Sequence, residues 1–336
     1  MKDVIKVVFF QRRPLPIHKS IEAIFDDVRS RMPSCVHCVT KVFSVYSQGL
    51  LPRLRIMYEA FRSQGDINHI TGDIHFAAIW LRRSKTMLTV HDCGMLASSG
   101  LKYRLLKYFW FTLPLKRTAL LTAVSEATRQ EILKHVAYPP EKIHVIPVAI
   151  SPGFRFVPKP FHRAKPVILQ VGVTQNKNIP RLMEALRGIP CQLVIIGVLP
   201  QEIREQLNAS GISYTNRFNL TQAELVEQYV QCDLLAFVST YEGFGMPIVE
   251  ANATGRPVIT SNLLSMPEVA GGSACLIDPY DTQQIRDGLL KIIHDDGYRS
   301  ILVEKGLENA RRFDAQFIAT RYLHLYKQLV STSCAE

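Results

Sequence analysis

Two carboxylates stand eight positions apart around a glycine-rich turn in the second half of the chain. Glu242 and Glu250 enclose the sequence Gly-Phe-Gly-Met-Pro-Ile-Val, and Pro247 is typical of the first turn of a helix. The N–H groups of a helix start, with the positive end of its dipole, attract phosphate or sugar oxygens. A carboxylate one turn into that helix can accept two hydrogen bonds from a ribose diol. The spacing therefore indicates one acidic group near a reacting sugar and one near a ribose.

Further candidate side chains follow apolar runs that are typical of buried strands. Lys177 lies in the loop after VILQVGV (167–173), where its ammonium group could bind a diphosphate; the alternative is a solvated loop lysine. His91 ends the run LTVHD, where it could contact a donor sugar or the transferring group; the alternative is a structural histidine. Glu268 fits either a ligand contact or a capping group at a helix start.

The second half of the chain predicts the elements that position these residues. Gly211 is typical of a helix end, and Thr221 with Glu224 forms a capping box. Strands that alternate with helices indicate a parallel sheet covered on both faces, with binding loops at the carboxyl ends of the strands. The predicted strands are 167–173, 191–197, 233–239, 256–261 and 274–279, and the predicted helices are 179–189, 200–211, 223–232, 247–254 and stretches within 281–312.

The first half has the same style but is less regular. Ser125 can cap a helix that begins at Glu126. The stretch 151–166 holds four prolines and little periodicity, so it is predicted to be a linker, and the long amphipathic stretch at 313–330 is predicted to be the last helix. The predicted strands of this half are 5–10, 39–46, 67–72, 87–92 and 120–125.

Charge is distributed unevenly along the 336 residues. Residues 1–150 hold 22 Lys and Arg against 11 Asp and Glu, a net charge of +11, and the remainder holds 18 of each sign. The basic half predicts an anionic partner: nucleic acid, an acidic membrane surface or a phosphorylated substrate.

The length predicts two domains, and no apolar run is long enough to span a membrane. The N-terminus is interpreted as a first strand, not a signal peptide, so a cytoplasmic protein is expected. Seven scattered cysteines argue against a disulfide framework. Cys35 and Cys38 have metal-like spacing without a second pair, so buried or half-buried thiols on a strand are favoured over a metal site.

The stretch EGFGMPIVE, followed by ANATGRPVI, resembles the donor-binding signature of family 4 glycosyltransferases. Other stretches resemble that family in the same order: LTVHD (88–92), TAVSE (122–126), VGVTQNKN in the loop that holds Lys177, and SNLLSMPEVAGG (261–272). The resemblance is specific over 165–280, moderate over 85–150 and weak before residue 85.

The resemblance implies an α/β protein of the GT-B fold, with two Rossmann-like, doubly wound domains that face a central cleft. It implies an acceptor domain at 1–150, a linker at 151–166, a donor domain at 167–313 and a C-terminal helix at 314–336 that crosses back to the first domain. The implied catalytic residues are Glu242, His91 and Lys177. The implied donor-binding residues are Gly172, Lys177, Asn178, Glu242, Gly243, Phe244, Gly245, Met246, Glu250, Ser265 and Glu268, with Met266 beside them.

The implied activity is retaining transfer of a sugar from a nucleotide-diphosphate sugar to a glycan or lipid-linked acceptor, in cell-envelope polysaccharide synthesis. The nucleotide sugar is a co-substrate, and no cofactor is required. No Asp-x-Asp motif occurs, so no metal is required either. No carboxylate nucleophile is evident. A front-face route is therefore favoured, in which the leaving phosphate accepts the proton of the acceptor.

Two departures from the family pattern concern the anionic groups. Val173 and Asn176 fill the positions where many members have an arginine beside the lysine. The loop QRRPLPIHKSIE has no glycine, whereas many members have a glycine-rich loop there. Arg12, Arg13 and Lys19 are therefore predicted to hold an anionic acceptor.

A segment at 100–117 mixes basic and aromatic residues. As an amphipathic helix it suits a membrane interface, and the alternative is a core helix with a solvated basic edge. The charge of the first half favours peripheral contact with an anionic membrane at the cytoplasmic face.

Three rival functions stay open. A nucleotide-sugar epimerase of the same fold would have no use for a basic half. A nicotinamide-dependent dehydrogenase is disfavoured because no Gly-x-Gly-x-x-Gly follows a strand. A nucleic-acid-binding protein is indicated by charge alone, without a recognisable motif, so no nucleic-acid partner is expected.

Overall fold

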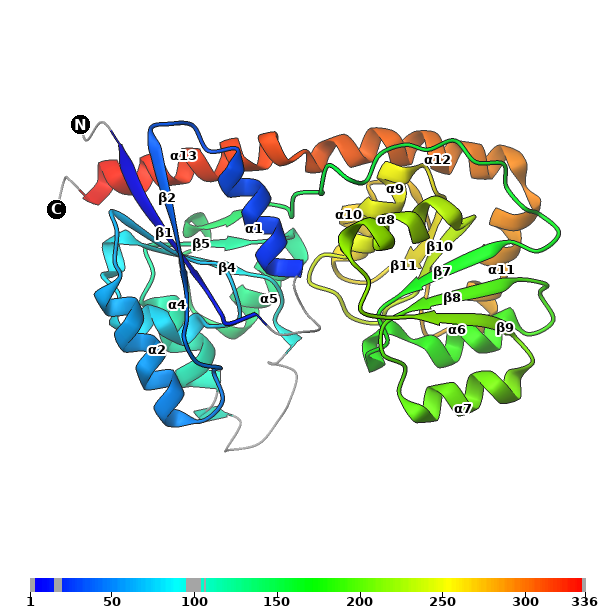
Figure 1. The fold of residues 1–336 in the computed structure, drawn as a ribbon, viewed down its shortest axis with the longest axis horizontal. Coiled ribbons are helices and arrows are strands. Elements are labelled where there is room, and N and C mark those ends of the chain that lie inside the picture. Colours follow the sequence, from blue (N-terminus) through cyan, green and yellow to red (C-terminus); the bar gives the residue numbers. More distant parts are fainter. Residues whose placement is uncertain (1–3, 15–19, 95–103, 106, 334–336) are drawn as a thin grey trace. The chain divides into compact units, whose positions relative to one another are not determined.

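The computed structural model describes residues 4–14, 20–94, 104, 105 and 107–333 of the chain. These residues form two compact units (Figure 1). Unit 1 comprises residues 1–149 together with 315–336, and unit 2 comprises residues 150–314. The last helix, α13 (Ala315–Ser333), therefore belongs to the same unit as the N-terminal half.

Each unit is built around a parallel sheet, as the alternating apolar and amphipathic runs predict. The sheet of unit 1 has the order β2-β1-β3-β4-β5-β6, and that of unit 2 the order β12-β11-β10-β7-β8-β9. The strands of unit 1 are β1 (Ile5–Gln11), β2 (Val36–Val42), β3 (Ile67–Ile70), β4 (Thr86–Val90), β5 (Leu120–Ala123) and β6 (Ile143–Val145); those of unit 2 are β7 (Val167–Val171), β8 (Gln192–Ile196), β9 (Ser213–Arg217), β10 (Leu234–Phe237), β11 (Val258–Ser261) and β12 (Ala274–Ile277).

Helices cover both faces of the unit 1 sheet because alternate strand residues point to opposite faces. Val8 and Phe10 of β1 pack in a core shared with α2, α4 and α5, whereas Val7 and Phe9 pack against α1 and α13. The helical elements are α1 (Ser20–Ser30), α2 (Leu50–Arg62), the 3-10 helices η1 (His75–Trp80), η2 (Arg83–Lys85) and η5 (Pro140–Lys142), the π-helical turn η4 (Tyr108–Thr112), α4 (Leu113–Lys116) and α5 (Glu126–His135).

The sheet of unit 2 is also covered on both faces. One face packs against α6, α7 and α11, and α9 lies on the other with α8, α10 and α12 as neighbours. The helical elements are the 3-10 helices η6 (Gln175–Lys177) and η7 (Arg311–Phe313), α6 (Ile179–Leu186), α7 (Gln201–Ser210), α8 (Gln222–Gln231), α9 (Met246–Thr254), α10 (Ser265–Ala270), α11 (Thr282–His294) and α12 (Asp296–Ala310).

The local signals for helix ends are confirmed. Ser125 accepts a hydrogen bond from the N–H of Thr128 and caps α5. Thr221 and Glu224 form both hydrogen bonds of the capping box of α8. Gly211 ends α7 in the left-handed conformation, with φ of 72°.

Other boundaries differ from the sequence-based expectation. The predicted strand 39–46 lies at 36–42, because β2 is an edge strand whose half-exposed residues weaken the alternation. The helices α1 and α2 and the strands β6 and β9 were not expected. The six cysteines in the described part of the chain are free thiols, with Cys35 just before β2 and Cys38 on it.

The proline-rich stretch 151–166 contains no helix or strand and lies against unit 2. The buried carboxylate of Asp233 holds it, because this group accepts hydrogen bonds from the N–H of His162 (3.2 Å) and of Val167 (2.7 Å) and pairs with Lys159. A buried carboxylate with three donors is well compensated for its loss of hydration. This stretch is therefore fastened to unit 2.

Candidate functional site

The candidate site lies where the strand order of the unit 2 sheet reverses. The chain winds outward from β7 through β8 to β9, and then returns to the other side of β7 to form β10. The two loops that leave β7 and β10 therefore diverge at the carboxyl edge of the sheet, which is where ligands bind in doubly wound folds. These loops carry Lys177 and Glu242.

Lys177 is held against the backbone of the loop after β7. Gly172 has φ of 90°, and a Cβ atom there would lie 2.6 Å from Cε of Lys177. The lysine stem therefore occupies the space that the glycine leaves open. Its Nζ lies 4.6 Å from the ring centroid of Phe237 on β10.

Lys177 and Glu242, both expected to be catalytic, meet directly. The Nζ atom of Lys177 donates a hydrogen bond to Oε1 of Glu242 at 2.6 Å, and the two side chains are 16% and 14% exposed. Asn176 fastens the two loops together: its Nδ2 donates to the carbonyl oxygen of Tyr241 at 2.8 Å, and its carbonyl oxygen accepts from the N–H of Thr240 at 2.8 Å. The ion pair is thus accessible to a ligand and rests on a braced backbone.

The helix α9 begins beside this ion pair. Gly245 precedes it with φ of 105° and no capping side chain, and a Cβ there would lie 3.2 Å from Cδ1 of Ile248. Phe244 is buried and packs edge-on against Phe313, with 5.6 Å between ring centroids. Met246 is the first residue of the helix, and Pro247 is the second, where its missing N–H is not needed.

Glu250 lies one turn into α9, as expected, but it is buried, with 9% of the residue exposed. Its Oε2 accepts a hydrogen bond from the hydroxyl of Tyr229 on α8 at 2.5 Å. Burial raises the pKa of the Glu250 carboxyl to about 7, against the opposing effects of the Tyr229 hydrogen bond and the Lys177 charge. Tyr229 was not singled out from the sequence, because a tyrosine in an amphipathic helix is more often core than site.

A third segment, at the start of α10, contacts the backbone of Glu242. The hydroxyl of Ser265 lies 2.9 Å from the carbonyl oxygen of Phe244 and 3.0 Å from that of Glu242. Leu264, which precedes α10, has φ of 51°, a strained value for a leucine. Met266 is fully buried, and Glu268 is half-buried in the first turn of α10.

Asn178 stabilises the conformation of the loop after β7. It adopts the left-handed conformation at the start of α6, with φ of 58°, and is buried. Its amide donates to the carbonyl oxygens of Val238 (3.1 Å) and Pro279 (2.7 Å), and its Oδ1 accepts from Arg181 (3.0 Å). Both ends of the side chain thus join the loop after β7 to its neighbours.

The candidate residues of unit 1 also lie at strand ends. Arg12, just after β1, pairs with Asp73 at 3.2 Å, and Arg13 donates to the carbonyl oxygen of Ser44 at 3.0 Å. Nε2 of His91, just after β4, donates to the carbonyl oxygen of Thr71 at 2.8 Å. Arg12 and His91 therefore lie at the carboxyl ends of β1 and β4, the two strands on either side of β3 in the sheet. Lys19 lies outside the described residues.

Two other histidines of unit 1 belong to its core. His69 is fully buried between the hydroxyls of Tyr326 and Thr89, each at 2.8 Å, and burial lowers its pKa to about 3. His75 is buried beside Phe111, and burial lowers its pKa to about 4. Both rings are therefore neutral near pH 7.

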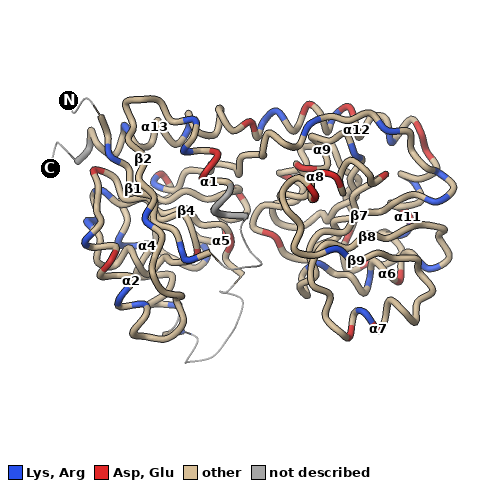
Figure 2. The backbone as a smooth tube through the Cα atoms, viewed as in Figure 1, with Lys and Arg blue, Asp and Glu red and all other residues tan. Residues whose placement is uncertain are grey.

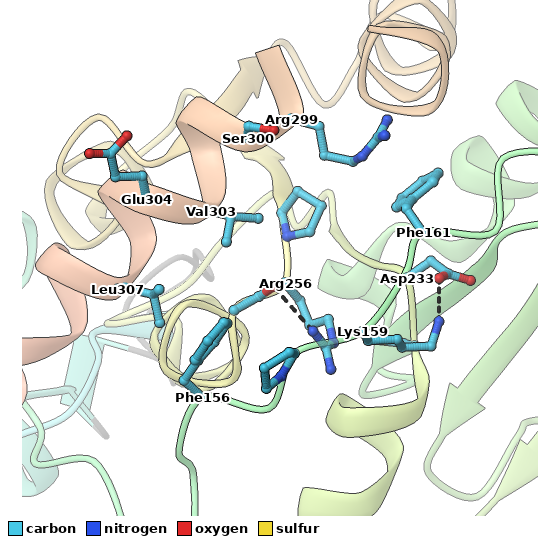
Figure 3. A pocket seen from close by; sticks show the side chains of 14 residues that line it. Phe156, Lys159, Phe161, Asp233, Arg256, Arg299, Ser300, Val303, Glu304 and Leu307 are labelled. Carbon is cyan, nitrogen blue, oxygen red and sulfur yellow. Dashed lines mark hydrogen bonds and ion pairs between the residues drawn. The ribbon is translucent and has the colours of Figure 1, made fainter. Parts of the chain in front are cut away.

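A pocket of about 460 Å³ lies at the opposite edge of the unit 2 sheet (Figure 3). Asp233 and Arg256 line it just before β10 and β11, together with Arg299 of α12. Four of its charged groups have partners: Lys159 pairs with Asp233, Arg256 donates to the carbonyl oxygens of Tyr229 and Val230, and Arg299 pairs with Asp296. Because the pocket lies at the amino ends of β10 and β11, it is remote from the loops at the carboxyl edge that hold the Lys177–Glu242 pair.

Two further findings concern only the described residues. Among them, no three His, Cys, Asp or Glu side chains gather as a metal-binding group. Nor does any helix in this part of the chain combine the length and the apolar content that a membrane span demands.

Known proteins resemble the chain over both units. Residues 7–154 match the family model "Glycosyltransferase Family 4", and residues 155–309 match "Glycosyl transferases group 1". An O-antigen chain mannosyltransferase B of Escherichia coli is 29% identical over 235 residues, which are 62% of this chain and 61% of that protein. An MMP alpha-(1->4)-mannosyltransferase of Mycolicibacterium hassiacum is 26% identical over 230 residues, 64% of this chain and 55% of that protein. The chain thus spans 61% or less of the length of these relatives.

Solved structures share the fold. HepE of Anabaena, in complex with UDP and glucose, has a TM-score of 0.79 at 17% identity and covers 96% of this chain and 100% of its own. Sucrose-phosphate synthase of Thermosynechococcus elongatus has a TM-score of 0.80 at 15% identity and covers 98% and 100%. Two parallel six-stranded sheets, these structural likenesses and the two family matches, which together take in residues 7–309, lead to one conclusion: the chain belongs to glycosyltransferase family 4 and has the GT-B fold.

Proposed function

We propose that the chain is a retaining glycosyltransferase that moves a sugar from a nucleotide-diphosphate sugar to a glycan or lipid-linked acceptor in polysaccharide synthesis. The contact between Lys177 and Glu242 carries the proposal, because it puts a cation and a carboxylate beside an uncapped helix start. The mannosyltransferase relatives support the reaction class, and the neighbour that holds UDP and glucose supports the donor class.

In this mechanism, the diphosphate replaces Glu242 as the ion-pair partner of Lys177. Breaking the bond between the sugar and the phosphate builds negative charge on the leaving diphosphate, and Lys177 stabilises it together with the N–H groups at the start of α9. Glu242, released from the ion pair, accepts hydrogen bonds from hydroxyl groups of the sugar. Gly243 and Gly245 let the ligand approach the backbone at this point.

The chemical step retains the configuration at the anomeric carbon. The acceptor oxygen forms its bond to that carbon on the face from which the diphosphate leaves, and the acceptor proton passes to a phosphate oxygen. His91 is proposed to contact the sugar, since its Nε2–H is engaged by Thr71 and its Nδ1 is then the hydrogen-bond acceptor of the ring. Glu250 is proposed to hold the ribose diol, with Tyr229 keeping its carboxylate in place.

The acceptor is proposed to be anionic, held by Arg12, Arg13 and Lys19, and to be presented at the cytoplasmic face of a membrane with which the protein associates peripherally. Arg12 and Arg13 support this proposal by their place after β1, although both are engaged within unit 1. An anionic acceptor would replace Asp73 as the ion-pair partner of Arg12.

The test is a transfer assay with a panel of nucleotide sugars and a membrane extract as the source of acceptor. A donor that raises the melting temperature and is consumed only with acceptor supports the proposal. Lys177→Ala and Glu242→Gln should each lower kcat/KM by about 100-fold or more, the scale of one lost transition-state contact, while the melting temperature changes little. Full activity in both folded variants would refute the assignment. Donor turnover without any acceptor would indicate an epimerase.

A further inference from the structure

One side of α2 carries large apolar residues that are exposed. The helix buries Ile56, Met57 and Ala60 against the sheet, as a surface helix should. The adjoining side of the helix carries five further large apolar side chains, and two of them, Leu50 and Leu51, are 68% and 77% exposed. We call these five residues the α2 face: Leu50, Leu51, Leu54, Tyr58 and Phe61.

The α2 face is continuous. At about 100° of rotation per residue, the five positions fall within roughly a third of the helix circumference. A helix on a water-exposed surface carries polar residues at such positions. On α2, the exposed apolar strip continues the buried one and leaves only a narrow polar strip, which holds Arg55, Glu59 and Arg62. An exposed apolar patch of this kind marks an interaction site.

Arginines border the α2 face. Arg55 and Arg62 follow it around the helix circumference, and Arg55 is 61% exposed although it pairs with Glu59 at 3.2 Å. Arg53 lies on the buried side of the helix, and its guanidinium lies 3.8 Å from the ring centroid of Trp110 in η4. The same turn also exposes Tyr108 and Phe109, which extend the set of exposed aromatic residues.

The charge of the whole N-terminal half has the same sign. Lys and Arg recur along unit 1 among fewer Asp and Glu (Figure 2). A surface with apolar and aromatic side chains at its centre and arginines at its border is complementary to a bilayer of anionic lipids. The apolar groups reach the boundary of the acyl chains, and the guanidinium groups meet the lipid phosphates.

We propose that the α2 face docks unit 1 onto an anionic lipid bilayer. The proposal names the surface through which the membrane association of the proposed function takes place. It rests on the proposed function only where the lipid-linked acceptor is concerned. Docking itself depends on apolar area and charge, so it can be measured without any transfer.

The experiment is co-sedimentation of the full chain with vesicles of phosphatidylcholine alone, or of an equal mixture of phosphatidylcholine and phosphatidylglycerol. The wild type should bind the mixed vesicles and lose binding as salt is added. The double variant Leu51→Glu/Leu54→Glu should reduce partitioning by about tenfold or more, because both charges enter the interface. Arg55→Gln and Arg62→Gln should each reduce it by about fivefold.

The control is Ile301→Glu, which puts one glutamate in place of an exposed apolar residue on α12 of unit 2. It should bind like the wild type. The proposal is overturned if the wild type stays in the supernatant with both vesicles, or if the double variant sediments as the control does. It is also overturned if the wild type is a dimer that the double variant converts to monomers, with no vesicle binding by either.

A transfer assay with a soluble acceptor separates this proposal from the proposed function. Vesicle binding without transfer would leave docking intact and remove the enzymatic assignment. Transfer without vesicle binding would do the reverse.

Discussion

At the scale of single residues, the site depends on how one lysine is held. Lys177 lies against Gly172 and reaches Glu242, so its position is set by the absence of a side chain on its neighbour. In the proposed mechanism, a ligand phosphate replaces the carboxylate with little movement of the lysine stem.

Gly172→Ala should therefore displace Lys177. The new Cβ would lie 2.6 Å from Cε of the lysine, and donor affinity should fall about tenfold, the scale of one charge-assisted hydrogen bond. Gly188→Ala is the matched control, because Gly188 also has positive φ, 73°, but meets no atom within 4 Å. Both variants should lose about 1 kcal/mol of stability. Titration with donor distinguishes them, and equal affinities would contradict this account.

We predict that Glu250, in its proposed contact with the ribose, makes donor binding depend on pH. The pKa of about 7 means that the carboxyl is partly protonated near neutrality, whereas two ribose hydroxyls require the ionised form. Donor affinity should rise as pH increases through about 7, and this dependence should be absent in Glu250→Gln. A wild-type affinity that stays constant between pH 6 and pH 8 would count against the assignment.

At the scale of elements, short contacts between loops position Glu242. Ser265 at the start of α10 bonds to the backbone on both sides of Gly243. Ser265→Ala should lower kcat by about tenfold through misplacement of Glu242, with a smaller effect on the donor KM.

A contrasting element is the capping box of α8. Thr221→Ala removes the hydrogen bond to the N–H of Glu224 and should cost about 1 kcal/mol of stability. It should leave kcat unchanged, since the box braces only the exposed start of that helix. Urea unfolding and steady-state kinetics on the two variants would show whether Ser265 has a role beyond stability, and equal kinetics would exclude it.

At the scale of the whole molecule, the two units should respond to acid in opposite ways. His69 and His75 have folded-state pKa values lowered to about 3 and about 4, so their stabilising effect is present above pH 6.5 and is lost as pH falls through those values. Glu250 has a raised pKa, so its stabilising effect is present below pH 4.5 and is lost as pH rises through about 7.

Between pH 7.5 and pH 5, hydrogen exchange should therefore show unit 1 losing about 4 kcal/mol of protection and unit 2 gaining about 2 kcal/mol. In Glu250→Gln, the gain in unit 2 should vanish while unit 1 behaves as before. Parallel loss of protection in both units of the wild type would show that other groups dominate the acid response.

The sequence by itself determined the parallel sheets, the helix caps and the pair of loops that carry Lys177 and Glu242. These features depend on local patterns: apolar runs, capping residues and glycines near one another in the chain. The same reasoning missed α2, because its apolar residues spread over more than half of the helix circumference and obscure the periodicity.

Only the tertiary structure decided how those loops meet and what surrounds them. Tyr229 lies beside Glu250 because α8 packs against α9. Ser265 contacts the backbone of Glu242 because β10 and β11 bring their loops to one edge of the sheet. Likewise, His69 becomes a core residue because α13, more than 200 residues later in the chain, supplies the hydroxyl of Tyr326. Burial and hydrogen-bond partners depend on these long-range contacts, so a local pattern cannot specify them.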